Sequence, residues 1–258
     1  MSVKIKVMTF NLRTRVVKDG NNCFDNRTDK IKAMLEKEQP DVIGFQEATT
    51  FMQDWLKDTL TDYYVLGCGR SEGYKGEGVP IAFRKDRFNL FQFRQEWLSL
   101  YPQKPASRFE GLDQTKCPRV FTCAEIVHKD CDTPISIFNI HTDYNGALTT
   151  RVLECATLMR AAAASPWKFV MTGDFNAHPD TPPISLIKAT AEELGTVEAT
   201  EHIAATFHGF KNGGATSKID YIFTNLPTDP AESYAVPDDD SCGCFYSDHN
   251  ALCAFVKI

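Results

Sequence analysis

The chain has 258 residues, 43% of them hydrophobic, so it can bury a large apolar core in one domain or two. Its formal net charge of -6 argues against a protein that coats nucleic acid non-specifically, because such binding depends on many Lys and Arg side chains. No segment forces a division of the chain, so we expect a single domain over residues 1–258.

The N-terminal segment MSVKIKVMTFN places lysines in a short alternating pattern, which is unlike a secretory signal or a membrane anchor. We therefore expect a cytoplasmic protein with no stable membrane association. The chain has nine cysteines, an odd number, and we expect free thiols. Cys242 and Cys244 form a CxC that could bind a soft metal, but no paired CxxC spacing supports a structural zinc site.

Hydrophobic periodicity predicts alternating strands and helices in the first part of the chain. The predicted elements are a strand at 4–10 ending at Asn11, a helix at 28–39, a strand at 41–45 ending in Gln46 and Glu47, a helix at 50–60, a strand at 63–68, and a hairpin at 81–93 turned at Lys85 and Asp86. Strand, helix and strand in succession imply a parallel or mixed sheet with a helix on its face.

The second part continues the pattern, and polar residues again follow the apolar runs. The predicted elements are strands at 120–128 and 134–140, the second leading into His141 and Asp143, a helix at 148–164, a strand at 168–172 followed by GDFNAHPD, a strand at 219–224 containing Asp220, and a strand at 251–258 entered from Ser247, Asp248 and His249.

Eight polar residues therefore lie at strand margins: Asn11, Glu47, His141, Asp174, Asn176, Asp220, Asp248 and His249. Strand ends along one edge of a sheet converge in space, which is where open sheets place their sites. Carboxylate and amide oxygens suit Mg²⁺ or Mn²⁺, and a histidine beside an aspartate suits proton transfer near neutral pH. The set favours hydrolysis of a phosphoester by water, without a covalent enzyme intermediate.

Six motifs in order, MTFNLR, GFQEA, NIHTD, TGDFNAHPD, SKIDYIFTN and YSDHNAL, resemble the endonuclease/exonuclease/phosphatase superfamily over nearly the whole chain. The resemblance implies an α/β protein with the deoxyribonuclease-like fold, a four-layer α/β/β/α sandwich of two packed mixed sheets. The His141 motif and the absence of a lysine after Glu47 are unlike the abasic-site repair branch. The segment is closer to the deoxyribonuclease, sphingomyelinase, phosphoinositide phosphatase and deadenylase-like branches.

The resemblance also assigns roles by motif. Glu47, with Asn11 and Asp248 nearby, would hold the divalent cation. Asp174 and Asn176 would position or activate the attacking water, and His141 would contact the phosphate. His249 would act as general base or as a transition-state hydrogen-bond donor, oriented by Asp220; the sequence leaves open whether Asp174 or His249 removes the proton.

Other residues have weaker assignments. Arg119 matches a basic position of many relatives and could contact phosphate, and His178 could touch substrate or be a solvated loop histidine. Asp143 could support His141 or cap a turn, and Glu77 could reach the site. The first hypothesis is a metal-dependent phosphodiesterase or phosphatase acting on a phosphorylated small molecule or nucleotide. One alternative is a nuclease acting on DNA or RNA, which the net negative charge disfavours. The other is a non-catalytic binding module.

Overall fold

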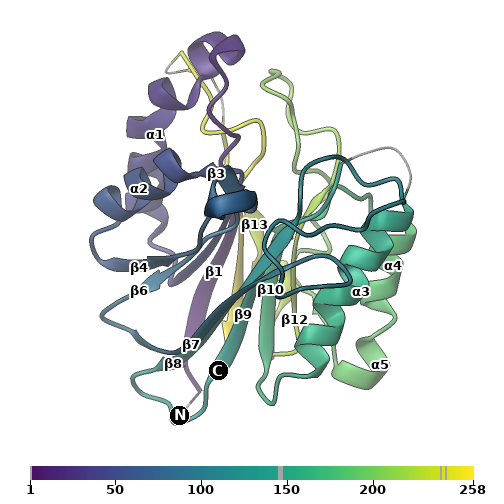
Figure 1. Ribbon diagram of the computed structural model, residues 1–258. Coiled ribbons are helices and arrows are strands. Elements are labelled where there is room, and N and C mark those ends of the chain that lie inside the picture. The colour runs from purple at the N-terminus through teal and green to yellow at the C-terminus, as the bar shows by residue number, and fades with distance from the viewer. Residues whose placement is uncertain (1, 145–147, 239, 242) are drawn as a thin grey trace.

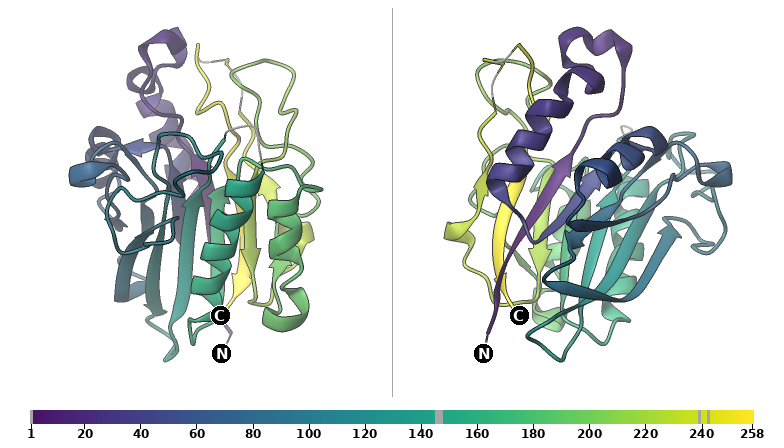
Figure 2. Two further views of the ribbon diagram at one scale, coloured as in Figure 1. Left: turned by 45° about the vertical axis from the view of Figure 1, so that its right-hand side comes forward. Right: turned by 90° about the vertical axis from the view of Figure 1, so that its left-hand side faces the viewer.

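A computed structural model describes residues 2–144, 148–238, 240–241 and 243–258 (Figure 1). Within these ranges, two six-stranded mixed sheets pack face to face, and helices cover the outer face of each sheet (Figures 1 and 2). The predicted four-layer α/β/β/α sandwich is therefore confirmed. Among the described residues, no helix combines the length and apolar character needed to cross a bilayer.

The first sheet carries the N-terminal strand beside the C-terminal one. Its strands, from edge to edge, are β13 (Tyr234–Ala235), β14 (Leu252–Lys257), β1 (Lys4–Asn11), β2 (Val42–Gln46), β6 (Ile81–Arg84) and β4 (Tyr63–Leu66). Strands β1 and β2 are parallel, and the other neighbours are antiparallel. Helices α1 (Phe24–Glu38) and α2 (Thr50–Thr59) cover the outer face.

The second sheet has the same mixture of one parallel pair and several antiparallel pairs. Its strands are β11 (Val197–Glu198), β12 (Asp220–Thr224), β10 (Phe169–Asp174), β9 (Ile135–His141), β8 (Val120–His128) and β7 (Phe88–Trp97), with β9 and β10 parallel. Helices α3 (Thr149–Ala163), α4 (Pro182–Lys188) and α5 (Ala191–Leu194) lie on its outer side. A separate two-stranded ribbon joins β3 (Ala48–Thr49) to β5 (Glu77–Gly78).

The predicted hairpin at 81–93 is wrong. Strand β6 pairs with β2 and β4 in the first sheet, whereas β7 pairs with β8 in the second. The short link between them instead carries the chain from one sheet to the other. Phe83 and Phe88 contact edge to face in the core between the sheets, and Arg87 in the link binds the buried Asp41. Two adjacent apolar runs can pair with each other or with other strands, and sequence periodicity does not distinguish the two cases.

Three apolar cores separate the four layers. One lies between the sheets, one between the first sheet and α1 and α2, and one between the second sheet and α3 and α4. Alternate residues of a strand contribute to different cores because successive side chains point to opposite faces. In β1, Val7 faces the other sheet and Met8 faces the helices; in β10, Val170 and Met171 do the same.

The face between the sheets changes from apolar to polar towards one end. Near that end, Asn139 of β9 accepts hydrogen bonds from Gln46 and Thr172 through Oδ1, at 2.7 and 3.1 Å. Its Nδ2 donates across the sandwich to the carbonyl of Phe45 at 2.7 Å. A Cβ on Gly44 would lie 2.0 Å from Thr172 Oγ1, so only glycine allows the sheets to approach this closely.

The cysteines of the described residues are free thiols, most of them buried. Cys242 lies outside the described residues, so the structure describes only Cys244 of the CxC. Trp97 is buried and donates its indole N–H to the carbonyl of Arg70 at 2.7 Å, so it packs in the protein interior and has no exposed face for stacking.

Candidate active site

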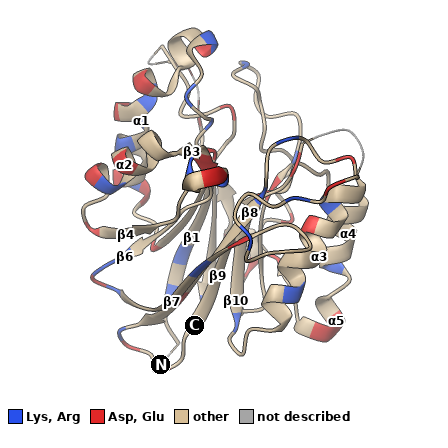
Figure 3. Cartoon of the chain, in the orientation of Figure 1, with Lys and Arg blue, Asp and Glu red and all other residues tan. Residues whose placement is uncertain are grey.

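Strand register brings the predicted residues to one end of the sandwich. In the second sheet, Asp174 at the end of β10 pairs with His141 on one side and with Asp220 on the other. Asn11 ends β1 in the first sheet, and its Nδ2 donates to Asp174 Oδ2 at 2.9 Å, so the two sheets meet at this contact. Figure 3 shows acidic and basic residues together at this end, next to β3, away from the chain termini.

A cavity of about 520 Å³ opens at this end of the sandwich. Six residues of the predicted set line it: Glu47, His141, Asp174, Asn176, Asp248 and His249. Asn11 and Asp220 are fully buried and contact these lining residues from below. The structure therefore brings all eight strand-margin residues together around one space.

Two carboxylates from the first sheet face the cavity as oxygen donors. Glu47 follows β2 in the left-handed backbone region, with φ of 58°, and this conformation turns the chain out of the sheet. Its oxygens accept from the Thr14 backbone N–H at 2.7 Å and from Asn11 Nδ2 at 3.2 Å. Burial and the nearby charge of Glu47 raise the pKa of Asp248, against the lowering effects of His249 and of Arg13, whose Nε lies 3.7 Å from Asp248 Oδ2.

His249 and Asp220 form a buried hydrogen-bonded pair that joins the two sheets. His249 Nδ1 lies 2.8 Å from Asp220 Oδ2, which also accepts from the Thr206 hydroxyl at 2.6 Å. The other ring nitrogen faces the cavity, 3.8 Å from Asp174 Oδ2 and 3.9 Å from Asp248 Oδ1. Burial disfavours the charged ring, but Asp220, Asp174 and Asp248 outweigh it and raise the pKa of His249 to about 10. The ring is therefore an imidazolium at neutral pH.

Amide groups make the hydrogen bonds to Asp174, and the His249 imidazolium lies 3.8 Å from its Oδ2. Its Oδ1 accepts from the Asn176 backbone N–H at 2.9 Å, and its Oδ2 accepts from Asn11. Burial and the neighbouring Asp220 raise the pKa of Asp174 above the usual carboxyl range, against the lowering effect of His249. A carboxylate of raised basicity facing a cavity is suited to accept a proton near neutral pH.

His141 differs from His249 in charge. Asn176 Nδ2 lies 3.0 Å from His141 Nε2, in a turn where Asn176 has φ of 44°. Burial, together with the positive charges of Arg119 and Arg70, holds the pKa of His141 well below its ordinary value. The cavity thus presents one charged and one neutral imidazole.

Arg119 and Arg70 also line the cavity. Arg119 is 1% exposed and pairs with Asp143 at 3.2 Å, and Arg70 pairs with Glu77 at 2.7 Å. Asp143 therefore holds Arg119 in place. It also caps the turn at Tyr144, whose backbone N–H donates to Asp143 Oδ1 at 2.9 Å.

The cavity lining differs from the sequence assignments at two residues, His178 and Arg70. His178 is exposed and is not among the residues that line the cavity, because the 3.1 Å turn from its carbonyl to the Thr181 N–H leads the chain away into α4. Arg70, which the sequence had not singled out, lines the cavity. Its only sequence signal was its place in the glycine-rich stretch GCGRSEGYKGEGVP, which predicted an open loop.

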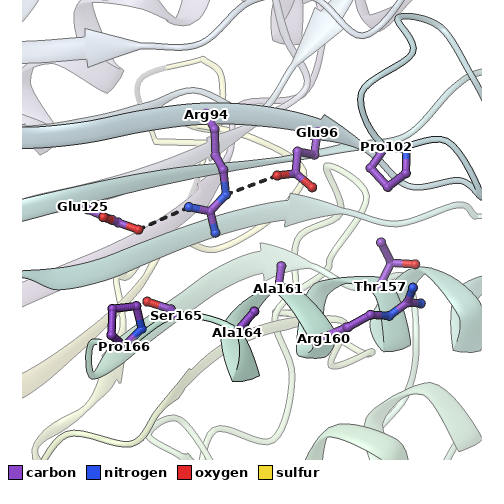
Figure 4. A pocket seen from close by; sticks show the side chains of 10 residues that line it. All are labelled: Arg94, Glu96, Pro102, Glu125, Thr157, Arg160, Ala161, Ala164, Ser165 and Pro166. Carbon is purple, nitrogen blue, oxygen red and sulfur yellow. Dashed lines mark hydrogen bonds and ion pairs between the residues drawn. The ribbon is translucent and has the colours of Figure 1, made fainter.

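A second hollow, of about 410 Å³, lies between β7, β8 and α3 and shares no lining residue with the first (Figure 4). Its central charge, Arg94, is bound by Glu96 and by Glu125, each at 3.2 Å. Arg94 is thus compensated by its own neighbours, so the hollow does not need a ligand to balance this charge.

Asp174, Asp220 and His249 also offer ligand atoms within 4.8 Å of one another, which is the spacing of a metal site. However, the Asp220–His249 hydrogen bond occupies one ligand atom of each partner. This group is therefore better suited to proton chemistry, and the oxygens of Glu47 and Asp248 remain for a cation.

Comparison with known proteins agrees with the geometry. The chain is 26% identical over 159 residues to the uncharacterized protein L388 of Acanthamoeba polyphaga mimivirus, a match that covers 59% of each protein. The endonuclease/exonuclease/phosphatase from Bacteroides vulgatus has a similar structure, with a TM-score of 0.89 and 25% identity over 98% of both chains. The mannosyl-6-phosphatase Bt3783 of Bacteroides thetaiotaomicron has a TM-score of 0.81 and 23% identity, covering 98% of this chain and 99% of that one. The model of the Endonuclease/Exonuclease/phosphatase family matches residues 8–249, and the chain belongs to this family.

Proposed function

We propose that the protein is a hydrolase of phosphoester bonds that depends on a divalent metal, Mg²⁺ or Mn²⁺. The observation that carries the proposal is the meeting of two kinds of group in one cavity. The carboxylate oxygens of Glu47 and Asp248 line it together with Asp174 and with His249, which is paired with the buried Asp220. The family membership and the similarity in fold to a mannosyl-6-phosphatase support the same reaction class.

The donor set fits a hard dication. Glu47 and Asp248 offer carboxylate oxygens, and Asn11 holds Glu47 from below. The raised pKa of Asp248 supports this, because a bound cation would favour the ionised carboxylate that burial and the charge of Glu47 disfavour. When bound, a dication of this kind polarises a phosphoryl oxygen and offsets charge on the leaving oxygen.

The chain's own residues supply the proton chemistry. Asp174 has the raised basicity and the amide supports needed to orient a water and accept its proton, with Asn176 beside it. His249 is already protonated through Asp220, so it donates a hydrogen bond to the developing charge rather than removing a proton. Neutral His141 and the buried Arg119 face the same space and contact the phosphoryl oxygens. A positioned water makes a covalent enzyme intermediate unnecessary.

Hydrolysis of simple esters tests the proposal directly. The purified protein is assayed with Mg²⁺, Mn²⁺ or EDTA on an aryl phosphomonoester, an aryl phosphodiester and single-stranded DNA. We expect turnover of the small esters that EDTA abolishes. Cleavage of DNA alone would support a nuclease, and failure on every substrate with both metals would contradict the proposed hydrolase.

Two variants separate the roles of the residues. His249→Ala should lower kcat by roughly 100-fold or more while Mn²⁺ affinity changes little. Glu47→Ala should lower Mn²⁺ affinity by at least about tenfold, because it removes a metal ligand rather than an outer-shell partner. Asp54→Asn, at an exposed pair with Lys57 on α2, is the matched control. Equal losses of Mn²⁺ affinity in the His249 and Glu47 variants would reject this division of roles.

A further inference from the structure

Two buried arginines from different parts of the chain line the same cavity. Arg119 precedes β8, and Arg70 lies in the loop between β4 and β5. Each lowers the pKa of His141, and Arg119 lowers that of Arg70, so the three cationic or potentially cationic groups are close neighbours. Burying two like charges together is unfavourable unless something negative offsets them.

Each arginine has a carboxylate partner, but these partners leave two N–H donors of Arg119 unused. Arg119 donates through Nη2 to Asp143, which also accepts from the Thr115 backbone and hydroxyl and from Tyr144. Its Nε and Nη1 are buried and have no hydrogen-bond partner among the described residues. The Tyr144 ring lies 5.7 Å from the guanidinium carbon and shields it further. Two unsatisfied donors on a buried guanidinium that lines a cavity indicate an anionic ligand.

Arg70 can bind a ligand while it stays paired with Glu77. Its Nη2 lies 2.7 Å from Glu77 Oε2, and burial together with the nearby Glu47 raises the pKa of Glu77. A guanidinium has five N–H donors, so Arg70 can keep Glu77 and still reach a ligand oxygen. Glu77 sits on β5, opposite Thr49, so this ribbon ties the Arg70 loop to the residues that follow Glu47.

Resting on the proposed function, we infer that Arg70 and Arg119 together bind the non-bridging oxygens of a phosphomonoester and select monoesters over diesters. A monoester dianion has three such oxygens, enough to meet both the cation site and the arginine pair. A diester has only two, and its additional ester group would place carbon against the buried guanidinium and leave its donors unpaired. Rejection by unpaired buried donors is a strong source of selectivity.

Two substrates with the same leaving group test this selection. The wild-type kcat/KM for p-nitrophenyl phosphate should exceed that for methyl p-nitrophenyl phosphate by about 100-fold or more, the worth of two charge-assisted hydrogen bonds. Arg70→Gln should lower the monoester value by at least about tenfold and the diester value by less than about threefold. Arg15→Gln, which removes an exposed arginine paired with Asp25, is the control and should change neither value.

A binding measurement keeps this inference separate from the proposed hydrolysis. By calorimetry with Mg²⁺, wild-type protein should bind phenylphosphonate at least about tenfold more tightly than its methyl monoester, and Arg70→Gln should lose this preference with unchanged Mg²⁺ affinity. If the protein shows no turnover but still prefers phenylphosphonate, the role of the arginine pair in binding is supported and the proposed hydrolase activity is contradicted. If the diester is hydrolysed as fast as the monoester, the inferred selection of monoesters is wrong, although the proposed hydrolase activity is supported. Equal binding of the two phosphonates would also overturn it.

Discussion

Replacing Asp220 with asparagine would remove the charge that orients and protonates His249 while keeping nearly the same shape. Asp220 is 1% exposed, and its Oδ2 is the hydrogen-bond partner of His249 Nδ1. We expect Asp220→Asn to lower kcat without a comparable loss of metal affinity, because Asp220 lies beneath the cavity rather than in its wall.

The magnitude follows from the pKa of His249. The ordinary value is 6.5 and the value in the fold is about 10, a preference for the imidazolium of about 5 kcal/mol at 1.36 kcal/mol per pKa unit. This value is the sum of the unfavourable effect of burial on the charged ring and the larger favourable effect of the three carboxylates. Asp220 contributes most among the three carboxylates, so we assign it about half, roughly 2 to 3 kcal/mol. The alkaline limb of the pH profile should therefore move from about 10 to about 8, so the loss in kcat should be small at pH 7 and reach roughly 30- to 150-fold above pH 10.

Stability should change with pH in a defined direction. A histidine whose pKa rises on folding adds stability below its unfolded pKa of 6.5, and that contribution is lost as the pH rises towards 10. The destabilisation caused by Asp220→Asn should therefore be largest near pH 6 and shrink towards pH 10. Urea unfolding across this range, the pH profile of ester hydrolysis and the imidazole titration by NMR measure these effects, with Asp54→Asn as control. An unchanged alkaline limb and an unchanged His249 titration would refute the role given to Asp220.

Three further predictions concern the scaffold. Asn139→Ala should destabilise the protein by about 3 kcal/mol in urea unfolding, because it leaves buried partners in both sheets unsatisfied; a loss below about 1 kcal/mol would show that the network relaxes. Lys218→Met should cost about 2 kcal/mol by the same measurement, because it removes the buried partner of Glu198 and leaves only the half-exposed Lys188 paired with it, while the exposed-pair variant Lys57→Met should cost less than about 1 kcal/mol. Under native conditions a thiol reagent should label exposed Cys117 first and leave Cys123 and Cys253 unlabelled, since burial raises the pKa of each of the last two to about 12; fast native labelling of either would contradict their burial.

Much of the site could be predicted because strand periodicity and residue type change together. In four strands, the positions facing the other sheet turn from aliphatic to polar towards the same end. The series are Val7, Thr9 and Asn11; Val42, Gly44 and Gln46; Ile137, Asn139 and His141; and Val170, Thr172 and Asp174. An aliphatic strand face that becomes polar at one end is a signal available from sequence, and it indicated the correct edge of the sheets.

Long-range pairing could not be predicted in the same way. The run at 81–93 has the periodicity of a hairpin, but whether its halves pair depends on strands that lie far away in sequence. Arg70 was missed for a similar reason. Its position at the cavity is set by the pairing of β5 with β3 and by the Arg70–Glu77 ion pair, neither of which leaves a local pattern. Loop residues acquire their neighbours from tertiary structure, so composition alone cannot place them.

The pairing of β14 with β1 has a consequence for the timing of catalysis during synthesis. His249 and Asp248 lie just before β14, which pairs with β1 from the other end of the described chain. A nascent chain therefore lacks both residues, and the register that aligns them, until translation has passed β14. The proposed phosphoester cleavage would therefore require synthesis of β14, so turnover should appear only after β14 has paired with β1.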